Sequence, residues 1–255
     1  MSGLIHQGVE RPVTWKQGKT WAYSIAYDEG FAALLDHVVP LHRRLGFPGH
    51  VAVVAGQVGV PRNVPGSSFD GMMTLGREEL RGLRREGWGV SCHSMTHPEV
   101  ITEATARREI VDSRRRLEET LGFAVPVFCV NYDMGNYPIS LKYAPDAGYR
   151  AILTIFDFVN RGRADLMRLG RVPLVSEFPP PFFSRFDPYR RIQQAAQSGG
   201  WIIDYCHCPM PGGPVHPAKD CSLEELEQRF EAVLRLGGRD VWLAEVNEVV
   251  AYLDA

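Results

Sequence analysis

The sequence lacks the features that mark disulfide-stabilised, membrane-spanning or nucleic-acid-binding proteins. It has five cysteines, an odd number without the regular spacing of a disulfide framework, so we expect reduced thiols. It has no apolar run of about 18 residues, the length that a transmembrane helix needs. The formal net charge is −2, without the block of Lys and Arg that binding to nucleic acid or an anionic membrane requires. We therefore expect neither nucleic acid nor a membrane as a partner.

The N-terminal segment also lacks the pattern of a secretory signal. Residues 1–18 contain no basic stretch followed by an apolar stretch of about seven or more residues. Together with the expected reduced thiols, this pattern predicts a cytoplasmic protein.

What the sequence does contain is the length and composition of one α/β domain. Hydrophobic residues make up 45% of the 255 residues and charged residues 23%, a balance that supplies a large core. Short apolar runs alternate with longer amphipathic stretches, the pattern of βα units around a parallel sheet. Neither an internal repeat nor a linker divides the chain. We therefore predict one domain over residues 1–255 with the fold of an α/β barrel.

The expected elements follow from that alternation. Strands are expected at residues 21–27, 50–55, 88–92, 127–130, 151–155, 171–175, 201–205 and 241–244. Helices are expected at residues 31–45, 74–86, 102–121, 188–197 and 223–236, and one more is expected to have its tail at 143–149. Residues 56–74 are rich in Gly, Pro, Asn and Ser, and a loop of that length in a compact domain is more often functional than idle.

Three of the expected strands end in residues that can carry chemistry. Asp28 and Glu29 end the first strand, and His93 follows the third, with His97 four residues later. His207 follows the strand at 201–205. In a parallel α/β barrel the loops after the carboxyl ends of the strands converge on one face, so these side chains can meet although they are far apart in sequence.

The histidine pair and the carboxylate pair together predict a metal site. A spacing of four puts the imidazoles of His93 and His97 on one side of a helical first turn, within reach of one cation. Two histidines and one carboxylate are the open ligand set of a catalytic metal. The alternative is structural, with His93 capping a helix, His97 on the surface and Asp28 capping a strand-to-helix turn.

The motifs around these residues resemble those of a known family. Residues 24–30, SIAYDEG, resemble its Thr-Phe-Asp-Asp-Gly motif, and residues 90–98, VSCHSMTHP, resemble its His-Ser/Thr-x-x-His-Pro motif. Residues 240–253 resemble its closing strand and helix, so the likeness covers nearly the whole chain. The family is the polysaccharide deacetylases, carbohydrate esterase family four. The resemblance implies a distorted (β/α) barrel of about seven parallel strands.

The resemblance also implies a role for each of these residues. Asp28 matches the general base, and Glu29 matches a metal-binding aspartate, to which it adds a methylene. His93 and His97 match the two metal histidines, so the implied cofactor is a divalent metal, with Zn²⁺ expected. His207 falls where the family has the general acid that protonates the leaving amine. A metal polarises the carbonyl and lowers the pKa of its water, while a base and an acid move the protons.

The sequence departs from the family where the base-orienting arginine is expected. Residues 129–133, CVNYD, stand in place of Arg-Pro-Pro-Tyr-Gly. Tyr132 is retained and can offer its backbone N–H to an oxyanion, but the arginine is absent. Arg161, Arg163 and Arg171 are the candidates for its replacement.

Other segments near the expected site leave alternatives open. Asp157 stands for a later aspartate that supports the acid histidine, without the tryptophan that usually follows it. Cys206 and Cys208 flank His207 and invite a zinc-site interpretation, but alternate residues of a strand point away from the residue between them. Residues 178–183, FPPPFF, form either a packed loop or an apolar wall of the pocket.

Three functions are compatible with the sequence. The first is a metal-dependent hydrolase that removes an acetyl group from an N-acetylated, or O-acetylated, carbohydrate. The second is a cytoplasmic hydrolase of a small non-sugar amide, as in the allantoinase-like members, toward whose Tyr-Glu-Glu-Gly motif residues 27–30, YDEG, lean. The presence of His93 and His97 favours the first. The third is a catalytically silent barrel that binds a ligand, supported by the missing arginine. A homo-oligomer is left open.

Overall fold

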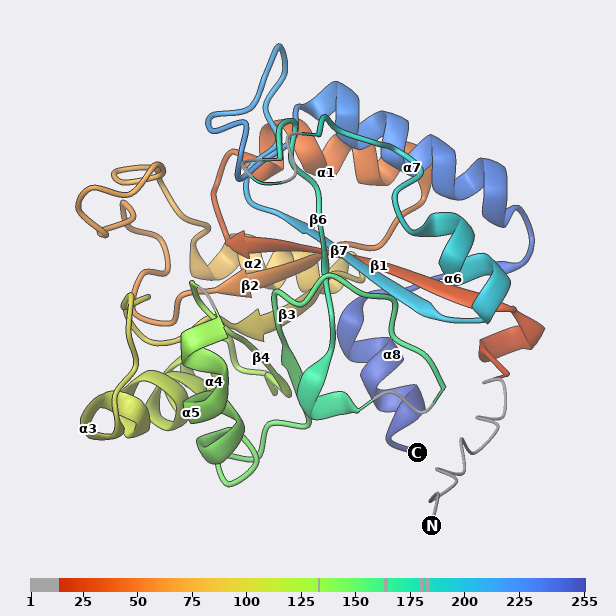
Figure 1. Ribbon diagram of the computed structural model, residues 1–255. Coiled ribbons are helices and arrows are strands. Elements are labelled where there is room, and N and C mark those ends of the chain that lie inside the picture. The colour runs from red at the N-terminus through yellow and green to blue at the C-terminus, as the bar shows by residue number, and fades with distance from the viewer. Residues whose placement is uncertain (1–13, 133, 163–164, 179–180, 182–183) are drawn as a thin grey trace.

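Parallel strands form a single curled sheet at the centre of the molecule (Figure 1). The computed structural model of the chain describes residues 14–132, 134–162, 165–178, 181 and 184–255. The strands are β1 (Trp21–Glu29), β2 (His50–Val53), β3 (Gly89–Cys92), β4 (Val127–Cys129), β5 (Ala151–Leu153), β6 (Val172–Pro173), β7 (Trp201–Cys206) and β8 (Val241–Leu243). Their order is β5-β4-β3-β2-β1-β7-β6, and β8 pairs with β1. Every one of these pairings is parallel, so the predicted α/β fold with about seven parallel strands is confirmed.

The two ends of the curled sheet come together just before β6. Leu169 forms a parallel bridge with Leu153 of β5. The amide of Thr154 donates to the carbonyl of Leu169 at 2.9 Å, and the amide of Leu169 donates to the carbonyl of Ile152 at 3.0 Å. This contact closes the sheet toward a distorted barrel and brings the chain around β6 close to the strands at the other end of the order.

Helices cover the sheet. They are α1 (Leu34–Leu45), α2 (Arg77–Arg85), α3 (Glu103–Ala106), α4 (Ser113–Leu121), α5 (Tyr137–Tyr143), α6 (Ile192–Ser198), α7 (Leu223–Gly237) and α8 (Val246–Leu253). A π-helical segment, η2 (Arg107–Asp112), joins α3 to α4, so one continuous helix occupies the predicted range 102–121. Short 3₁₀ segments lie at Lys16–Gly18, Met134–Asn136 and Leu166–Arg168. Within the described residues, no helix has the length and apolar character needed to cross a membrane.

Several helix predictions were wrong at their ends. The helix expected from residue 31 begins at Leu34, and the helix expected from residue 188 begins at Ile192. Gly76, not Thr74, precedes α2, and its amide donates to Glu79 at 2.6 Å. The Thr74 hydroxyl instead donates to the carbonyl of Val60 at 2.9 Å, which ties the long loop to itself. The helix expected to have its tail at 143–149 already ends at Tyr143, and turns lead from there to β5.

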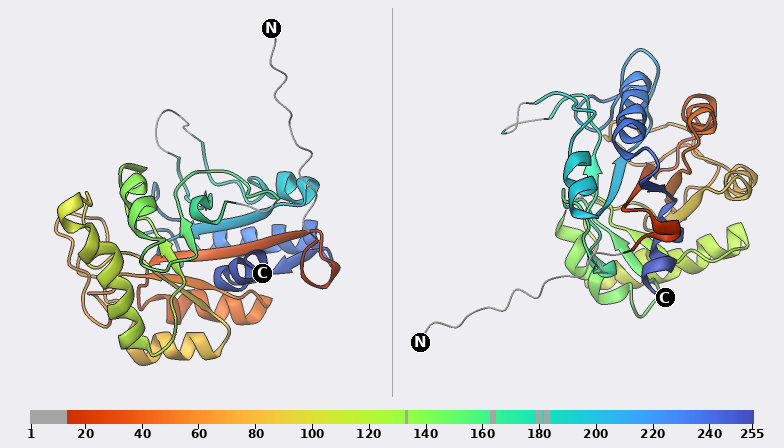
Figure 2. Two further views of the ribbon diagram at one scale, coloured as in Figure 1. Left: turned by 90° about the horizontal axis from the view of Figure 1, so that it is seen from below. Right: turned by 90° about the vertical axis from the view of Figure 1, so that its right-hand side faces the viewer.

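Buried side chains on the two faces of the sheet form two apolar clusters. Along β1, Tyr23 belongs to the larger cluster, together with residues of α1, α2 and α7, whereas its neighbour Ala22 belongs to the second. The second cluster includes Val246 and Val250 of α8. Figure 2 shows α1, α2 and α7 arranged along one side of the curled sheet. Alternation along the strands therefore fixes which residues face the outer helices and which face α8.

The strands point toward a face built from long loops. In Figure 1 the arrowhead of β1 lies at the left, on the same side as the orange loop of residues 56–74. Because all strands run parallel, the residues that follow β1, β3 and β7 emerge on this face, as predicted.

Candidate active site

The end of β1 turns sharply and buries two carboxylates. Glu29 and Gly30 both have left-handed backbone conformations, with φ of 70° and 68°. A Cβ at Gly30 would lie 3.1 Å from the Val51 side chain, so the conformation and the space both favour glycine. The turn leaves Asp28 and Glu29 each only 4% exposed. Buried carboxylates require partners, and each of these two has an arginine.

Arg171 is the partner of Asp28. Its Nη1 donates to Oδ1 at 2.7 Å and its Nη2 to Oδ2 at 3.1 Å, while its Nε donates to the Thr154 carbonyl at 2.9 Å. The guanidinium is fully buried and lies 4.2 Å from the ring of Tyr205. Burial alone would raise the pKa of the Asp28 carboxyl, but Arg171 and His93 hold that pKa well below its usual range. Asp28 is therefore an ionised, firmly oriented carboxylate.

His93 and His97 meet through a loop, and the predicted helical turn is wrong. The residues after β3 are not helical, and Ser94 and His97 have left-handed backbone conformations with φ of 67° and 61°. The Ser94 hydroxyl accepts the His97 amide at 3.0 Å. The two Nε2 atoms lie 3.2 Å apart. His93 Nδ1 donates to the Cys129 carbonyl at 2.9 Å, which leaves its Nε2 bare when the ring is neutral.

Glu109 holds the histidine loop in this shape. Its carboxylate accepts hydrogen bonds from the amides of Met95 and Thr96, at 3.1 and 2.9 Å, and from the Thr96 hydroxyl at 2.9 Å. Glu109 is 2% exposed and lies in η2, the π-helical segment. The carboxylate thus replaces the hydrogen bonds that a helical turn would have given these amides.

His207 extends from the end of β7 on the same face. Its ring stacks on Phe69 of the long loop, with the ring centroids 5.0 Å apart, and its Nδ1 donates to the Lys219 carbonyl at 3.0 Å. Burial lowers its pKa to about 4, against the opposing effect of Asp28. At neutral pH the imidazole is therefore neutral and carries its lone pair on Nε2.

Asp220 anchors the backbone around His207. It accepts the amides of His207 at 3.0 Å and Cys208 at 2.6 Å, and burial raises its pKa to about 7. Its carboxylate lies within 4.8 Å of the thiols of Cys206 and Cys221, a grouping that includes Cys206 but not Cys208. All five cysteines are free, as expected. Because both carboxylate oxygens are used by backbone amides, we interpret this cluster as an anchor for the strand end.

One cleft collects most of the predicted residues. Its volume is about 540 Å³. It is lined by Asp28, Glu29, Arg62, Pro65, Gly66, Ser67, Phe69, His93, His97, Glu99, Val130, Tyr132, Ile155, Tyr205, His207 and Lys219. Tyr132 is 39% exposed, has φ of 57°, and its ring lies 4.9 Å from that of His97. The cleft thus brings together two carboxylates, from Asp28 and Glu29, and three imidazoles, from His93, His97 and His207, which follow separate strands.

The sequence matches the family model described as "Polysaccharide deacetylase" over residues 16–152, more than half of the chain. The chain belongs to the polysaccharide deacetylase family. A comparison with curated proteins gave no significant match.

Solved structures share the fold of this deacetylase-family chain at low sequence identity. A Mycobacterium smegmatis protein assigned to the polysaccharide deacetylases has 14% identity and a TM-score of 0.56, and the match covers 95% of this chain and 93% of that one. IcaB from Ammonifex degensii has 21% identity and a TM-score of 0.53, with 68% and 72% covered. The Xyl-CE4 domain of a multidomain xylanase from the hindgut metagenome of Trinervitermes trinervoides has 13% identity and a TM-score of 0.52, with 92% of each chain covered.

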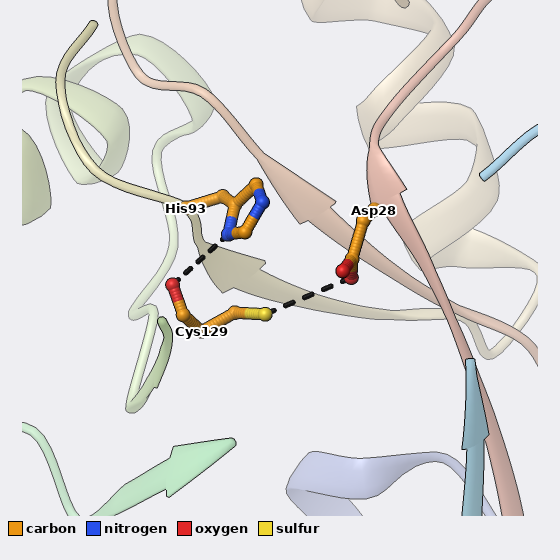
Figure 3. Close-up of side chains that lie close together, drawn as sticks. All are labelled: Asp28, His93 and Cys129. Atoms are coloured by element: carbon orange, nitrogen blue, oxygen red, sulfur yellow. Dashed lines mark hydrogen bonds between the residues drawn. The ribbon is translucent and has the colours of Figure 1, made fainter. Parts of the chain in front are cut away.

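In this deacetylase-family chain a cysteine lies where the family's arginine is expected. The Cys129 thiol donates to Asp28 Oδ1 at 3.6 Å, and the Cys129 carbonyl accepts from His93 (Figure 3). Burial raises the pKa of this thiol well above its ordinary value, so it stays protonated. Arg171 supplies the bidentate contact instead, and Arg163 lies outside the described residues.

Of the three residues that match the family's metal ligands, the two histidines are arranged to bind a metal, whereas Glu29 is not. Nitrogen ligands at about 2.0–2.1 Å from a tetrahedral zinc ion lie a little over 3 Å apart, which the 3.2 Å between the Nε2 atoms of His93 and His97 matches. Burial lowers the pKa of both histidines, so both offer lone pairs. Glu29 Oε1 lies 3.8 Å from His97 Nε2, but the same oxygen accepts from Arg62 Nη2 at 2.8 Å. Among the described residues, the group around His93 whose ligand atoms all lie within 4.8 Å of one another consists of Asp28, His93 and Cys129, without Glu29.

Asp157 lies beside the cleft and not against His207. Its carboxylate pairs with Arg190 and Arg191, whereas His207 Nδ1 contacts a backbone carbonyl. These three residues line a second cavity of about 720 Å³, which shares His207 with the cleft. Phe178 lines this second cavity and is not part of the cleft lining, while residues 179–180 and 182–183 lie outside the described residues.

Four functional contacts were not assigned from the sequence. Glu109, Asp220 and Arg62 were missed, and Arg171 was one of three candidates. Arg62 lies in the long loop of residues 56–74, which was predicted to be functional from its length and composition. That prediction was the one signal in the sequence for this residue. Glu109 and Asp220 accept hydrogen bonds from backbone amides, and such contacts cannot be predicted from the spacing of residues in a sequence.

Proposed function

We propose that this member of the polysaccharide deacetylase family hydrolyses the acetyl amide of an N-acetylated carbohydrate, with Asp28 as general base and His207 as general acid. The observation that carries the proposal is the ionised Asp28 carboxylate, fixed at both oxygens by Arg171 and facing the cleft that His207 also lines. A base and a proton donor on separate walls of one cleft suit an amide, whose nitrogen must gain a proton as water attacks the carbonyl.

Each side chain has a separate task in this proposal. Asp28 accepts a proton from the attacking water, since it is ionised and cannot rotate away from Arg171. His207 is neutral in the free protein, so it first takes up a proton from solvent on Nε2 and then delivers it to the leaving nitrogen, while Asp28 releases the proton it accepted from water to solvent. The backbone N–H of Tyr132 faces the developing oxyanion in this scheme.

His93 and His97 would hold a divalent metal together with Glu29 as the carboxylate ligand, with Zn²⁺ expected from the nitrogen donors. When bound, such a metal polarises the carbonyl and lowers the pKa of its water. Replacement of His93 by alanine should then remove both metal and hydrolysis, and full metal occupancy in that variant would reject the assignment.

Hydrolysis of a small non-sugar amide is the second candidate. It is favoured by Glu29 in the first motif and by a cleft of about 540 Å³, a size that suits a single small ligand. The third candidate, a silent binding barrel, rested on the missing arginine. Arg171 now contacts Asp28, which removes that support.

A substrate panel separates the candidates. Purified protein is assayed with and without added Zn²⁺ for acetate release from N-acetylglucosamine oligomers and for ring opening of small cyclic amides, with Asp28→Asn as the blank. The proposal expects acetate release from the acetylated sugars. Turnover of cyclic amides alone would favour the second candidate, and turnover of neither class would overturn the proposal.

A further inference from the structure

The second carboxylate of the β1 turn, Glu29, carries its own counter-ion. Arg62 Nη2 donates to Glu29 Oε1 at 2.8 Å, and Arg62 Nε contacts Oε2. The side chains are 3% and 4% exposed, respectively, so this ion pair is as buried as that of Asp28. Arg62 reaches Glu29 from the loop of residues 56–74, at the wall of the cleft.

Local hydrogen bonds hold Arg62 in this position. Its amide donates to the carbonyl of Met72 at 2.8 Å, and its carbonyl accepts the amide of Gly71 at 2.8 Å. Its Nη1 also contacts the Ser67 hydroxyl. The loop is thus built around the backbone of Arg62, and its guanidinium is directed at Glu29.

Each carboxylate of the β1 turn therefore has a guanidinium partner without any added cation. Arg171 pairs with Asp28, and Arg62 pairs with Glu29. In the metal site of the proposed function, Glu29 is the third ligand of a divalent ion held by the two histidines, a two-His-one-carboxylate set. The Glu29 oxygen nearest the histidines, Oε1, is the one to which Arg62 Nη2 donates. A cation at the histidines and the Arg62 guanidinium therefore require the same carboxylate and repel each other.

We propose that Arg62 is a built-in competitor of the metal. It holds Glu29 while the histidines are free, and a divalent cation binds fully only when Arg62 gives up that carboxylate. Arg62 therefore sets the metal affinity of the site, as a positioning residue of Glu29. The inference rests on the metal site of the proposed function, with Glu29, His93 and His97 as ligands.

Zinc affinity of the protein stripped with a chelator tests this competition without any substrate. Zn²⁺ is titrated against a chromophoric chelator for the wild type, Arg62→Gln, Arg62→Lys and the control Lys219→Gln, which removes another cation from the same cleft. Arg62→Gln should bind Zn²⁺ about tenfold or more tightly, the scale on which contacts to metal ligands act. Arg62→Lys should gain less, since a lysine keeps the charge but not the two-pronged contact. Lys219→Gln should stay near the wild type.

A second measurement covers the loss of stability that Arg62→Gln brings by leaving Glu29 unpaired. Thermal melting with and without Zn²⁺ should show a larger metal-induced rise in Tm for Arg62→Gln than for the wild type, and His93→Ala should abolish that rise. Equal or weaker zinc binding by Arg62→Gln, an equal gain in Lys219→Gln, or no zinc binding by any variant would overturn the competition. The acetate-release assay is independent of it, so a protein that passes the zinc test yet cleaves no amide defeats the proposed function alone.

Discussion

Single side chains in the cleft have fixed charges, and the proposed chemistry depends on them. Asp28 is ionised because Arg171 donates to both of its oxygens, and His207 is neutral because burial disfavours its charged form. The proposed base is therefore ready in the free protein, whereas the proposed acid must first gain a proton.

Replacement of Asp28 by asparagine should abolish turnover and leave metal binding intact. The amide keeps the shape of the side chain but cannot accept a proton, so we expect a loss of roughly a hundredfold or more in kcat. Steady-state kinetics and metal analysis of the same preparation check both parts. Loss of metal in this variant would mean that Asp28 is a ligand and that the roles of Asp28 and Glu29 must be exchanged.

Replacement of His207 by alanine should discriminate between leaving groups. An amine leaves only when protonated, whereas an activated phenolate leaves unaided, so amide hydrolysis should fall far more than hydrolysis of an activated acetate ester. Rates on both substrates, with the metal content unchanged, provide the measurement. Equal losses on the two substrates, or none on either, would make His207 a structural residue.

Several of these residues were predictable one by one. Asp28, His93, His97 and His207 follow directly from motifs at strand ends, and all of them line the cleft. Their partners were not predictable, since a buried ion pair or a carboxylate on backbone amides depends on three-dimensional packing and leaves no spacing in the sequence.

At the scale of elements, β6 has an importance that its two residues do not suggest. The chain enters it through Arg171, and the bridge between Leu169 and Leu153 sets the position of that arginine relative to β5. The counter-ion of the proposed base on β1 is therefore delivered from the edge strand β6, which is separated from β1 by β7 in the strand order.

Replacement of Arg171 by glutamine should destabilise the protein and raise the pKa of the base. Removing one partner of a buried ion pair costs about 3–5 kcal/mol, and Asp28 loses the charge that keeps its pKa low. Urea denaturation measures the first effect, and an upward shift of the acidic limb of the rate profile measures the second. Arg161→Gln, a change at an exposed neighbour on the same segment, serves as control. An unchanged acidic limb would show that Arg171 does not set the ionisation of the base.

The strands were easier to predict than the helix ends and loops. Apolar runs at residues 21–27, 50–55 and 88–92 mark buried parallel strands, and their predicted positions agree with β1, β2 and β3 to within two residues at either end. Thr74 was misassigned because its hydroxyl bonds within the long loop. The His93–His97 spacing suggested a helical turn, but Glu109 from the helical stretch that follows the loop satisfies the loop amides and allows two left-handed residues.

For the whole molecule, buried titratable groups predict a loss of stability in acid. Burial lowers the pKa of His42 to about 3 and that of His207 to about 4, so the unfolded chain binds protons more tightly than the folded one below about pH 6.5. Stability from these groups is complete above that pH and is lost as the pH falls toward their folded values. Asp220 acts in the opposite sense: its raised pKa of about 7 adds stability that declines as the pH rises from about 4 to 7.

Because the lowered histidines outnumber Asp220, the free energy of unfolding should fall between pH 6.5 and pH 5. Urea denaturation across this range measures it. His42→Gln should flatten the slope by up to about 1.4 kcal/mol per pH unit, since one proton is no longer linked to unfolding. His37→Gln, on the same helix, is the control. A slope unaltered by His42→Gln would show that the pKa of His42 does not differ between the folded and unfolded states.

The long separation between Asp28 and its arginine also limits how such genes can recombine. In relatives that keep the family's arginine at the position of Cys129, the proposed base and its counter-ion both precede any recombination point placed between residues 129 and 171. A hybrid with its first part from such a relative and its second part from this chain would have two guanidiniums directed at one aspartate. The reciprocal hybrid would have none. Exchange in either direction damages the site, so the two arrangements are expected to be inherited as separate, intact lineages.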